Sequence, residues 1–446
     1  MRDQEFDELL RCFTGELRTS SDREVPAAGM GRLVQTIRGA AELVTSAWRS
    51  RGRAGLRETD FAKLAGLVNR LGSLKGIPMK MGQIAGLLET DLPEEMRRLM
   101  ALLQTQSPAM PFRIVEEVVR QDLGDRAEPL LRKLERDPVS AASIGQVHRG
   151  RLPDGQRVAV KVRHPGIEEA IRTDMSGAVA GAAFARLLLP GMGETARDFV
   201  EEARTRFLEE CDYALEAERQ RLFGRLFASS ADVAIPRVMD GWCGPRVLTT
   251  GWEDGRDFDS FSASATQPER DRAGRALFEV YVGTLYRHGL FHADPHPGNY
   301  QFRADGRVVV FDFGCVRAFE PPAVAAFVAL ARAVRERDEE GMRSALRGLG
   351  ADPPENSKAF ARIRALLEGF FAPMLQPGAH PIDGRIAIDA RQVASDKLAI
   401  ARIRLPGKLL FLFRIRFGLY SVLARLGAVC DWSAIETGWA GAVPQG

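Results

Sequence analysis

Three short motifs occur in one order along this chain, and their residue types together suit phosphoryl transfer. They are VAVK at residues 158–161, HADPHPGN at residues 292–299 and DFG at residues 312–314. Phosphoryl transfer needs a cation on the nucleotide phosphates, oxygen ligands for magnesium, and an acid or base near the attacking oxygen. Each motif supplies one of these parts, so the chain is predicted to contain a kinase-like ATP site.

Lys161 is the residue of the first motif that could hold a nucleotide. A Pro-Asp-Gly turn at residues 153–155 separates strand-like runs at residues 145–150 and 157–162, so a β-hairpin is expected, with this lysine on its second strand. Its ammonium would lie against the α and β phosphates, and Glu216 is the candidate carboxylate that would hold it there. Taken alone, the lysine is equally consistent with a surface residue on an edge strand.

The second and third motifs supply the catalytic and metal-binding groups. The spacing of Asp294 and Asn299 lets one loop present a base or orienting carboxylate together with a magnesium-binding amide. Asp312 follows a run of apolar strand residues, so its carboxylate can emerge at a strand end to bind the metal that bridges the phosphates. Turns with helix-capping aspartates are the alternative for each motif, but their joint occurrence in this order favours a nucleotide site.

A loop of small residues lies where a protein kinase carries its glycine-rich loop. It contains Ser140, Ala141, Ala142 and Ser143, which we expect to contact the nucleotide. Such a loop still offers backbone N–H donors to phosphates, but its Cβ atoms limit how closely it can cover a nucleotide. The Ser140 hydroxyl could add a phosphate contact or cap the turn, and the cap is favoured.

The composition is that of an ordinary folded protein without a strong overall charge. The 446 residues are 45% hydrophobic, and 62 Lys and Arg against 59 Asp and Glu leave a formal charge of +3. This balance argues against a nucleic-acid partner, so a phosphate ligand would have to be held by local charge. The five cysteines show no CxxC pair or nearby histidine cluster, which argues against zinc and a disulfide framework and favours a reducing, cytoplasmic setting.

Neither a secretory signal nor a transmembrane helix is predicted. The N-terminus lacks the basic start and apolar core of a signal peptide. The apolar stretch at residues 177–189 is too short and contains an arginine, and the stretch at residues 409–428 is interrupted by Arg414, Arg416 and Arg425.

The periodicity divides the chain into three expected parts of an α+β, protein-kinase-like, bilobal fold. Residues 1–112 read as a mainly helical extension. Residues 113–250 read as a small β-rich lobe with the hairpin and a further strand at residues 246–250, and residues 251–446 as a mostly helical lobe with a helical C-terminus.

Within these parts, the segments that carry candidate site residues are expected to be long and regular. One periodic helix is expected over residues 201–222. Residues 255–286 read as helical apart from a polar stretch at residues 260–268, and beyond residue 321 only helices are expected, apart from a loop around residues 377–384.

Together the motifs resemble those of the UbiB/AarF family of atypical protein-kinase-like ATPases, whose members are linked to ubiquinone and other isoprenoid-lipid metabolism. The resemblance also covers KMGQ at residues 80–83, which matches the family's KxGQ pattern, SIGQVH at residues 143–148 and ECDY at residues 210–213. By itself KMGQ would read only as a helix with an interior glycine. HADPHPGN is highly specific, whereas HxDxxxxN alone also occurs in small-molecule phosphotransferases.

Carried over residue by residue, the resemblance implies a complete nucleotide site. Lys161 and Glu216 would form its ion pair, Asn299 and Asp312 would hold Mg²⁺, and Asp294 would be the catalytic carboxylate, with ATP or ADP as the nucleotide. An isoprenoid lipid or quinone precursor is the implied further partner.

The resemblance also implies a regulatory role for the N-terminal extension. Lys80 would pair with Glu210, and Gly82 and Gln83 complete the same segment. The extension would lie over the place where a protein kinase accepts its peptide, which favours ATP hydrolysis or small-molecule phosphorylation over phosphorylation of proteins in trans.

Three functions stay open from the sequence. The leading one is a Mg²⁺-dependent ATPase coupled to quinone or lipid handling, and the others are a small-molecule phosphotransferase and a nucleotide-gated lipid-presenting scaffold with little catalysis. Pro321 follows Gly314 within seven residues, without the Ala-Pro-Glu segment that ends a kinase peptide platform. Several relatives carry membrane-spanning C-terminal helices, whereas the arginines here imply at most peripheral membrane contact. The oligomeric state is not predicted.

Overall fold

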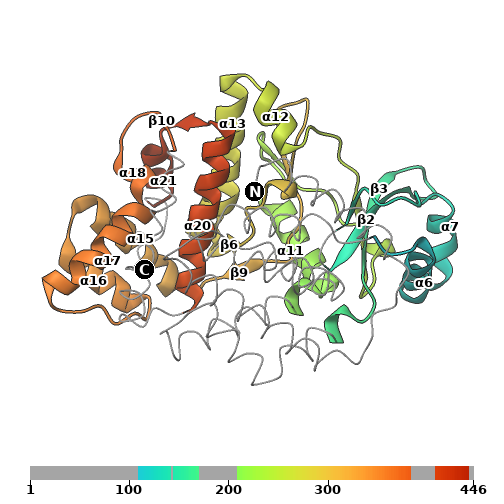
Figure 1. Ribbon diagram of the computed structural model, residues 1–446, viewed down its shortest axis with the longest axis horizontal. Helices are drawn as coiled ribbons and strands as arrows, with labels where there is room; N and C mark the ends of the chain where they lie inside the picture. The colour runs from blue at the N-terminus through green and yellow to red at the C-terminus, as the bar shows by residue number, and fades with distance from the viewer. Residues whose placement is uncertain (1–108, 142–143, 170–207, 383–406, 441–446) are drawn as a thin grey trace, which may run out of the picture. The chain divides into compact units, whose positions relative to one another are not determined.

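The structure, a computed structural model, describes residues 109–141, 144–169, 208–382 and 407–440 (Figure 1). These residues belong to two compact units. The first contains residues up to 214 together with residues 239–251, and the second contains residues 215–238 and those from 252 onward.

The first unit is built on an antiparallel sheet in the order β1-β2-β3-β5. Its strands are β1 (Ser140–Ala141), β2 (Gly145–Arg151), β3 (Arg157–Arg163) and β5 (Val247–Gly251). Gly155 lies in the turn between β2 and β3 at φ 89°, a left-handed backbone conformation that favours glycine. The predicted hairpin and the predicted strand near residues 246–250 are therefore confirmed.

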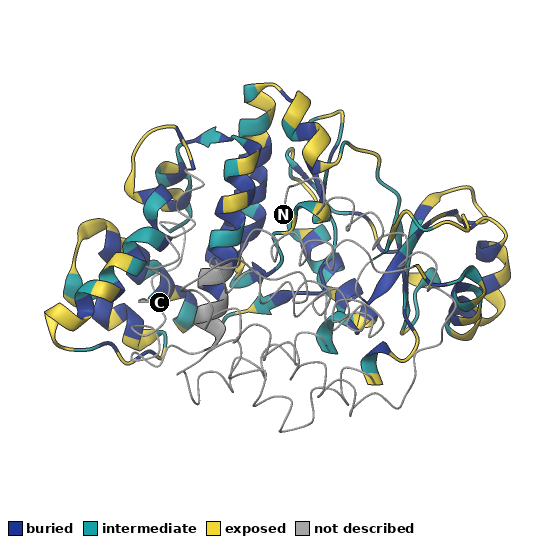
Figure 2. Ribbon diagram, in the orientation of Figure 1, coloured by how far each residue is buried: buried dark blue, intermediate teal, exposed yellow. Residues whose placement is uncertain are grey.

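Alternation along β3 gives the first unit its core. Val158, Val160 and Val162 are fully buried, whereas the residues between them are only partly covered. Figure 2 shows by colour how burial varies along the helices and strands. Two helices pack on the face with the three valines, α6 (Phe112–Leu123) and α7 (Ala127–Leu131), and the short 3₁₀ turn η1 (Gly124–Arg126) connects them. The side chain of Asp122 fastens α6 to the sheet, because it accepts hydrogen bonds from the backbone N–H and the guanidinium of Arg246.

Two buried polar side chains on β2 anchor the chain just before α6. The Gln146 amide accepts from the Met110 N–H at 2.6 Å and donates to the Met110 carbonyl at 3.3 Å. Its nitrogen also lies 2.8 Å from His148 Nε2, while His148 Nδ1 lies 2.8 Å from the carbonyl oxygen of Glu135. A neutral His148 that accepts at Nε2 and donates at Nδ1 satisfies every partner in this chain of contacts.

The long helix expected over residues 201–222 is not continuous, so that prediction was wrong. Residues 208–210 are helical, but Cys211 and Asp212 form a turn, and α11 (Tyr213–Leu226) begins after them. The N–H groups of Cys211 and Asp212 bond to carbonyls three residues back, which tightens and ends the first helix.

In its described residues, the second unit consists mainly of helices with three small sheets. Its helices from residue 252 onward are α12 (Phe258–Ser264), α13 (Gln267–Phe278), the π-helix η3 (Glu279–Gly283), α14 (Thr284–His288), α15 (Pro321–Glu336), α16 (Glu339–Gly348), α17 (Ser357–Phe370), α18 (Ala372–Leu375), α20 (Gly407–Leu426) and α21 (Trp432–Ala440). Its strand pairs are β6 (Leu290–His292) with β9 (Val316–Ala318), β8 (Val308–Val310) with both β4 (Val233–Ala234) and β7 (Tyr300–Phe302), and β10 (His380–Pro381) with β11 (Val429–Cys430).

Two further sequence predictions were wrong in this unit. The polar stretch at residues 260–268 contains most of α12, because Asp257 caps the helix by accepting from the Ser260 N–H at 2.8 Å and the helix buries Phe258 and Phe261. The region beyond residue 321 is not purely helical, because β10 pairs with β11.

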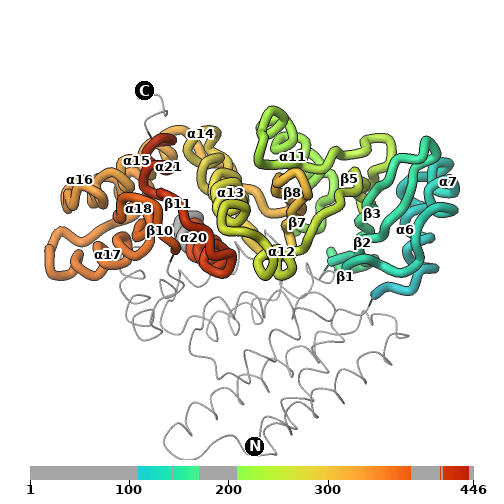
Figure 3. Tube along the Cα trace, turned by 90° about the horizontal axis from the view of Figure 1, so that it is seen from above, coloured from blue at the N-terminus to red at the C-terminus, as the bar shows by residue number. Residues whose placement is uncertain are grey.

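The helices α13 and α20 lie side by side and form the centre of the second unit (Figures 1 and 3). A Cβ on Gly274 of α13 would come within 2.4 Å of the Ala428 side chain, so glycine permits this close approach. Trp432, which is fully buried, packs its ring on Phe278 with the centroids 5.1 Å apart.

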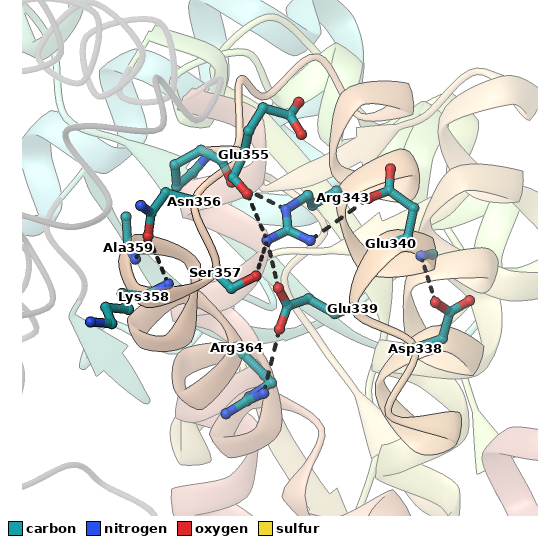
Figure 4. A network of polar contacts seen from close by, with 12 residues as sticks. Asp338, Glu339, Glu340, Arg343, Glu355, Asn356, Ser357, Lys358, Ala359 and Arg364 are labelled. Atoms are coloured by element: carbon teal, nitrogen blue, oxygen red, sulfur yellow. Dashed lines mark hydrogen bonds and ion pairs between the residues drawn. The ribbon is translucent and has the colours of Figure 1, made fainter.

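A buried arginine of α16 bonds to the loop that connects α16 to α17 (Figure 4). Arg343 is 5% exposed and donates to the Glu339 carboxylate at 2.5 Å and to the Pro354 carbonyl at 3.1 Å. Its guanidinium also lies 4.3 Å from the centroid of the Phe360 ring. These contacts fix the loop before α17.

A second buried arginine lies in α20, in the apolar stretch considered above. Arg416 is 2% exposed and makes a two-pronged ion pair with the fully buried Glu436, at 2.7 and 2.5 Å. Tyr286 donates to the same carboxylate, and Tyr420 donates to the Phe370 carbonyl. In the part of the chain that the structure describes, no helix combines the length and apolar character needed to cross a membrane.

Candidate nucleotide site

Backbone hydrogen bonds join the HADPHPGN motif and the DFG motif within the second unit. The strand that enters the catalytic loop, β6, pairs with β9, which follows the DFG segment, and the Ala293 N–H donates to the Cys315 carbonyl at 2.7 Å. At the other end of the loop, the Phe311 N–H donates to the Asn299 carbonyl at 2.9 Å, which extends the pairing of β7 with β8. The predicted loop and turn are therefore adjacent.

His292 links the loop and the turn from inside the core. It is fully buried, and its Nε2 lies 2.8 Å from the carbonyl oxygen of Asp312, while its Nδ1 accepts from the Asp294 N–H at 3.3 Å. These contacts assign the proton to Nε2. Burial lowers the pKa of His292, which keeps the imidazole neutral and this pattern intact.

The side chains of Asp294 and Asn299 meet in the catalytic loop. Asn299 Nδ2 donates to the Asp294 carboxylate at 3.1 Å and to the Asp294 carbonyl at 3.3 Å. A 3₁₀ turn, η4 (Pro297–Asn299), brings the asparagine back toward the aspartate. Because the amide nitrogen faces Asp294, the Asn299 carbonyl oxygen points away from it and is placed to act as a cation ligand.

Asp312 has a left-handed backbone, which is uncommon for a residue with a side chain. Its φ is 58°, and its Oδ1 accepts from the Gly314 N–H at 3.1 Å, which fixes the carboxylate in the turn. Aspartate is among the few residues that adopt this conformation, partly because its short side chain can bond locally. The DFG turn therefore sets both the direction and the orientation of a candidate metal ligand.

The helix α11 holds the DFG turn through two contacts. The fully buried Phe313 packs against Phe223 of α11 and against His292, with ring centroids 5.1 and 5.3 Å apart. Arg219 of α11 donates to the Gly314 carbonyl at 2.7 Å.

The remaining predicted site residues are placed by their own elements. Lys161 lies in β3 between Val147 of β2 and Leu248 of β5, and its Nζ is 5.1 Å from the centroid of the Tyr213 ring. Glu216 is 2% exposed in the first turn of α11, a burial at which a carboxylate requires charged or hydrogen-bonding partners. The Lys161–Glu216 ion pair stays a prediction.

The small-residue loop and the regulatory segment are described only in part. Ser140 and Ala141 form β1, opposite Val147 and Gln146, and Glu210 is half-buried at the end of a helical segment. Ala142, Ser143, Lys80, Gly82 and Gln83 lie outside the described residues. Their contacts with nucleotide, and the pairing of Lys80 with Glu210, stay predictions.

The loop and turn fit a magnesium-nucleotide ligand. Mg²⁺ prefers oxygen ligands, usually one or two from protein together with phosphate oxygens and water. The amide oxygen of Asn299 and the carboxylate of Asp312 form a donor set of that kind. The His292 contact with the Asp312 carbonyl and the loop pairing described above hold these two donors on adjacent backbone segments.

Such an arrangement of catalytic loop and DFG turn defines a kinase-like protein. In agreement with this class, a family model described as the ABC1 atypical kinase-like domain matches residues 102–346, more than half of the chain. The chain therefore belongs to the ABC1 atypical kinase-like family. This confirms the family resemblance inferred from the motifs.

Individual relatives of the chain are also named as kinases. The chain is 30% identical over 294 residues to Protein ACTIVITY OF BC1 COMPLEX KINASE 8, chloroplastic, of Arabidopsis thaliana, covering 65% of this chain and 38% of that protein. It is 27% identical over 354 residues to Atypical kinase coq-8, mitochondrial, of Caenorhabditis elegans, covering 75% of this chain and 46% of that protein. The chain thus spans less than half the length of these two relatives.

A solved structure shares the fold. The structure of Rv3197 from Mycobacterium tuberculosis, determined with erythromycin, is 27% identical in sequence and superimposes with a TM-score of 0.59. The match covers 86% of this chain and 98% of that one. The predicted α+β, protein-kinase-like fold is confirmed.

Several residues that shape the site were not found by sequence reasoning. Arg219 and Phe223 lie three and seven residues after Glu216, which places them on the same side of the helix, a spacing visible in the sequence. Tyr281 had no such signal, because its position depends on a π-helix that breaks the 3.6-residue period.

Proposed function

We propose that this protein binds ATP or ADP with Mg²⁺ and catalyses Mg²⁺-dependent ATP hydrolysis or phosphoryl transfer in support of isoprenoid-quinone or lipid handling. The observation that carries the proposal is the joint geometry of loop and turn. Asn299 donates its amide nitrogen to Asp294, and the left-handed Asp312 is tied to His292 through its carbonyl.

Each candidate residue has one role in this proposal. The Asp294 carboxylate orients the attacking hydroxyl or water and accepts its proton. The Lys161 ammonium, held by Glu216, binds the α and β phosphates. Asn299 and Asp312 hold Mg²⁺, which would neutralise the charge that develops on the phosphates.

The segment after the DFG turn supports water or a small molecule as the acceptor. Gly314 is followed by the short strand β9, and α15 begins at Pro321. A peptide platform needs a longer activation segment than this. A small-molecule phosphotransferase is therefore the second candidate function, and the coupling to quinones or lipids rests on the family resemblance.

The test is steady-state ATP hydrolysis by the full chain with and without Mg²⁺, in three conditions: buffer, liposomes, and a quinone-like headgroup compound. Lys161→Ala and Asp312→Asn are the controls, with nucleotide binding measured in parallel. Turnover that requires Mg²⁺, rises with lipid and is lost in both controls supports the coupled ATPase. Transfer of labelled γ-phosphate to a polar metabolite would favour the phosphotransferase, and saturable nucleotide binding without turnover would favour a nucleotide-gated scaffold.

A further inference from the structure

The helix that leads toward the catalytic loop contains a π-helical segment. Between α13 and α14, residues Glu279–Gly283 adopt the wider π-helical turn. Thr284 donates its hydroxyl to the Val280 carbonyl at 2.7 Å, which helps satisfy the altered backbone pattern. A Cβ on Gly283 would come within 3.1 Å of the Trp439 ring, so a larger residue would press on α21. π-helical segments are rare and shift the direction of the side chains they contain, often at functional sites.

Tyr281 is the residue whose side chain this segment directs at the catalytic loop. It is fully buried, and its hydroxyl donates to the backbone carbonyl of Asp294 at 2.9 Å. Its ring meets His292 edge to face, with centroids 4.9 Å apart. Burial raises the pKa of Tyr281 well above its usual range, so the phenol keeps its proton and stays a donor.

The backbone carbonyl of Asp294 accepts the hydrogen bond from Tyr281, and a shift of this carbonyl would also affect Asn299. The carbonyl also accepts from Asn299 Nδ2, at the longer distance of 3.3 Å. The same amide group carries the oxygen that we assign to Mg²⁺, so its orientation matters for the metal. Without the Tyr281 hydroxyl, the weaker contact from Asn299 would be left to hold this carbonyl. The side chains of Asp294 and Asn299 could then both shift.

We propose that Tyr281 is a positioning residue, and that the π-helix directs its hydroxyl at Asp294 to fix the Asp294–Asn299 pair for Mg²⁺-nucleotide chemistry. This inference rests on the proposed function. It assigns Tyr281 no contact with the nucleotide, so its effect passes through Asp294 and Asn299.

A neighbouring tyrosine supplies a matched control. Tyr300 is also buried, at 2% exposed, and its ring meets that of Tyr281 edge to face, with centroids 6.0 Å apart. Its hydroxyl interacts with the hydroxyl of Tyr281, and no hydrogen bond joins it to the described residues of the catalytic loop. Tyr281→Phe and Tyr300→Phe therefore each remove one oxygen from the same cluster and keep both rings, but only the first removes a contact with the loop.

The experiment compares both variants with the full-length wild type. We expect Tyr281→Phe to lower kcat about tenfold and also to raise the KM for ATP in Mg²⁺, because the catalytic carboxylate is misplaced and the metal ligand beside it is no longer held in position. Tyr300→Phe should keep the wild-type kcat. Melting temperatures of all three proteins show whether either variant is simply less stable.

A second readout does not require turnover. The Kd for ATP is measured in Mg²⁺ and in EDTA, and the ratio of the two values reports on the metal site. We expect Tyr281→Phe to reduce this ratio about tenfold, as is usual when a group that orients metal ligands is removed. Wild-type kcat and a wild-type ratio in Tyr281→Phe, or equal losses in both variants, would overturn the inference but leave the proposed function standing. A wild type that binds no nucleotide would overturn both.

Discussion

Arg219 and Gly314 are joined by a 2.7 Å hydrogen bond from the guanidinium to the glycine carbonyl. Arg219 lies about one turn after Glu216 on α11, so the helix that carries the candidate partner of Lys161 is attached to the turn that carries the candidate metal ligand. The packing of Phe313 on Phe223 adds an apolar contact between the same two segments. A displacement of α11 would therefore displace the DFG turn as well.

Arg219→Met should weaken this coupling, because methionine keeps much of the apolar stem and removes the donors. A hydrogen bond from a charged donor contributes about 1.5–3 kcal/mol, so we expect Mg²⁺-dependent turnover to fall about tenfold or more. Arg225→Met, at an exposed position of the same helix, is the control and should change turnover by less than about twofold. The two variants are compared at saturating ATP over a Mg²⁺ titration, and equal activities would show that the contact is not used.

The left-handed backbone of Asp312 predicts different outcomes for its polar and apolar replacements. Asparagine tolerates φ near 58°, so Asp312→Asn should stay close to wild type in its free energy of unfolding while losing Mg²⁺-dependent turnover. Asp312→Val should lose turnover and also destabilise the fold by about 1–2 kcal/mol, because a β-branched residue is strained in this region. Denaturant unfolding of both variants measures the difference, and equal stabilities would show that the turn relaxes without cost.

Protonation of His148 should reduce stability in acid. Burial lowers the pKa of His148 in the folded protein below its ordinary value, so the folded state binds fewer protons than the unfolded state near pH 6. The free energy of unfolding should therefore rise with pH, with the contribution complete above about pH 6.5 and lost as the pH falls toward the folded-state pKa. Protonation would also place an N–H against the Gln146 amide nitrogen and break the link to Met110.

His148→Gln tests this pH dependence, because glutamine does not titrate. Its stability should vary less steeply between about pH 5 and pH 7, by up to about 1.4 kcal/mol per pH unit, the value for one proton. Some slope should persist, since burial also lowers the pKa of His288 and His292. An unchanged slope in urea unfolding across this range would exclude His148 as the titrating group.

The sequence motifs predicted the closeness of Asp294 and Asn299 because both residues belong to one short loop, whereas the catalytic and metal-binding roles of the loop and the DFG turn stay predictions. Asp294 and Asn299 are five residues apart and bond to each other within one loop. The β-hairpin that carries Lys161 was equally accessible, because its Pro-Asp-Gly turn and its alternating valines are local signals. Such features need no knowledge of distant contacts.

Features that depend on tertiary contacts were missed or misassigned. The hydrophobic periodicity continues through Cys211 and Asp212, so the sequence predicted an unbroken helix there. In the structure, the N–H groups of these two residues bond to carbonyls three residues back, and the helix ends. The pairing of β10 with β11 joins segments whose two-residue strands are too short to show alternation. The π-helix around Tyr281 is stabilised by Thr284 and by packing on α21, neither of which leaves a pattern along the sequence.

The arginine that interrupts the apolar stretch of α20 has a structural role that sequence reasoning did not assign. Arg416 and Glu436 are both buried and bonded at two points, so removing one charge would leave the other unpaired in the core. We expect Glu436→Gln to destabilise the protein by about 3–5 kcal/mol. The double variant Arg416→Met, Glu436→Leu should be less destabilised than the sum of its single variants, because it leaves no unpaired charge.

An exposed ion pair between α20 and α12 provides the comparison for this prediction. Arg425 and Asp259 are 2.9 Å apart, but their side chains are 53% and 84% exposed. Asp259→Asn should therefore change the free energy of unfolding by less than about 1 kcal/mol. Guanidinium unfolding at neutral pH measures all of these variants. If Glu436→Gln were no more costly than Asp259→Asn, the buried pair would have to admit water or rearrange, and α21 would not depend on it for its position against α20.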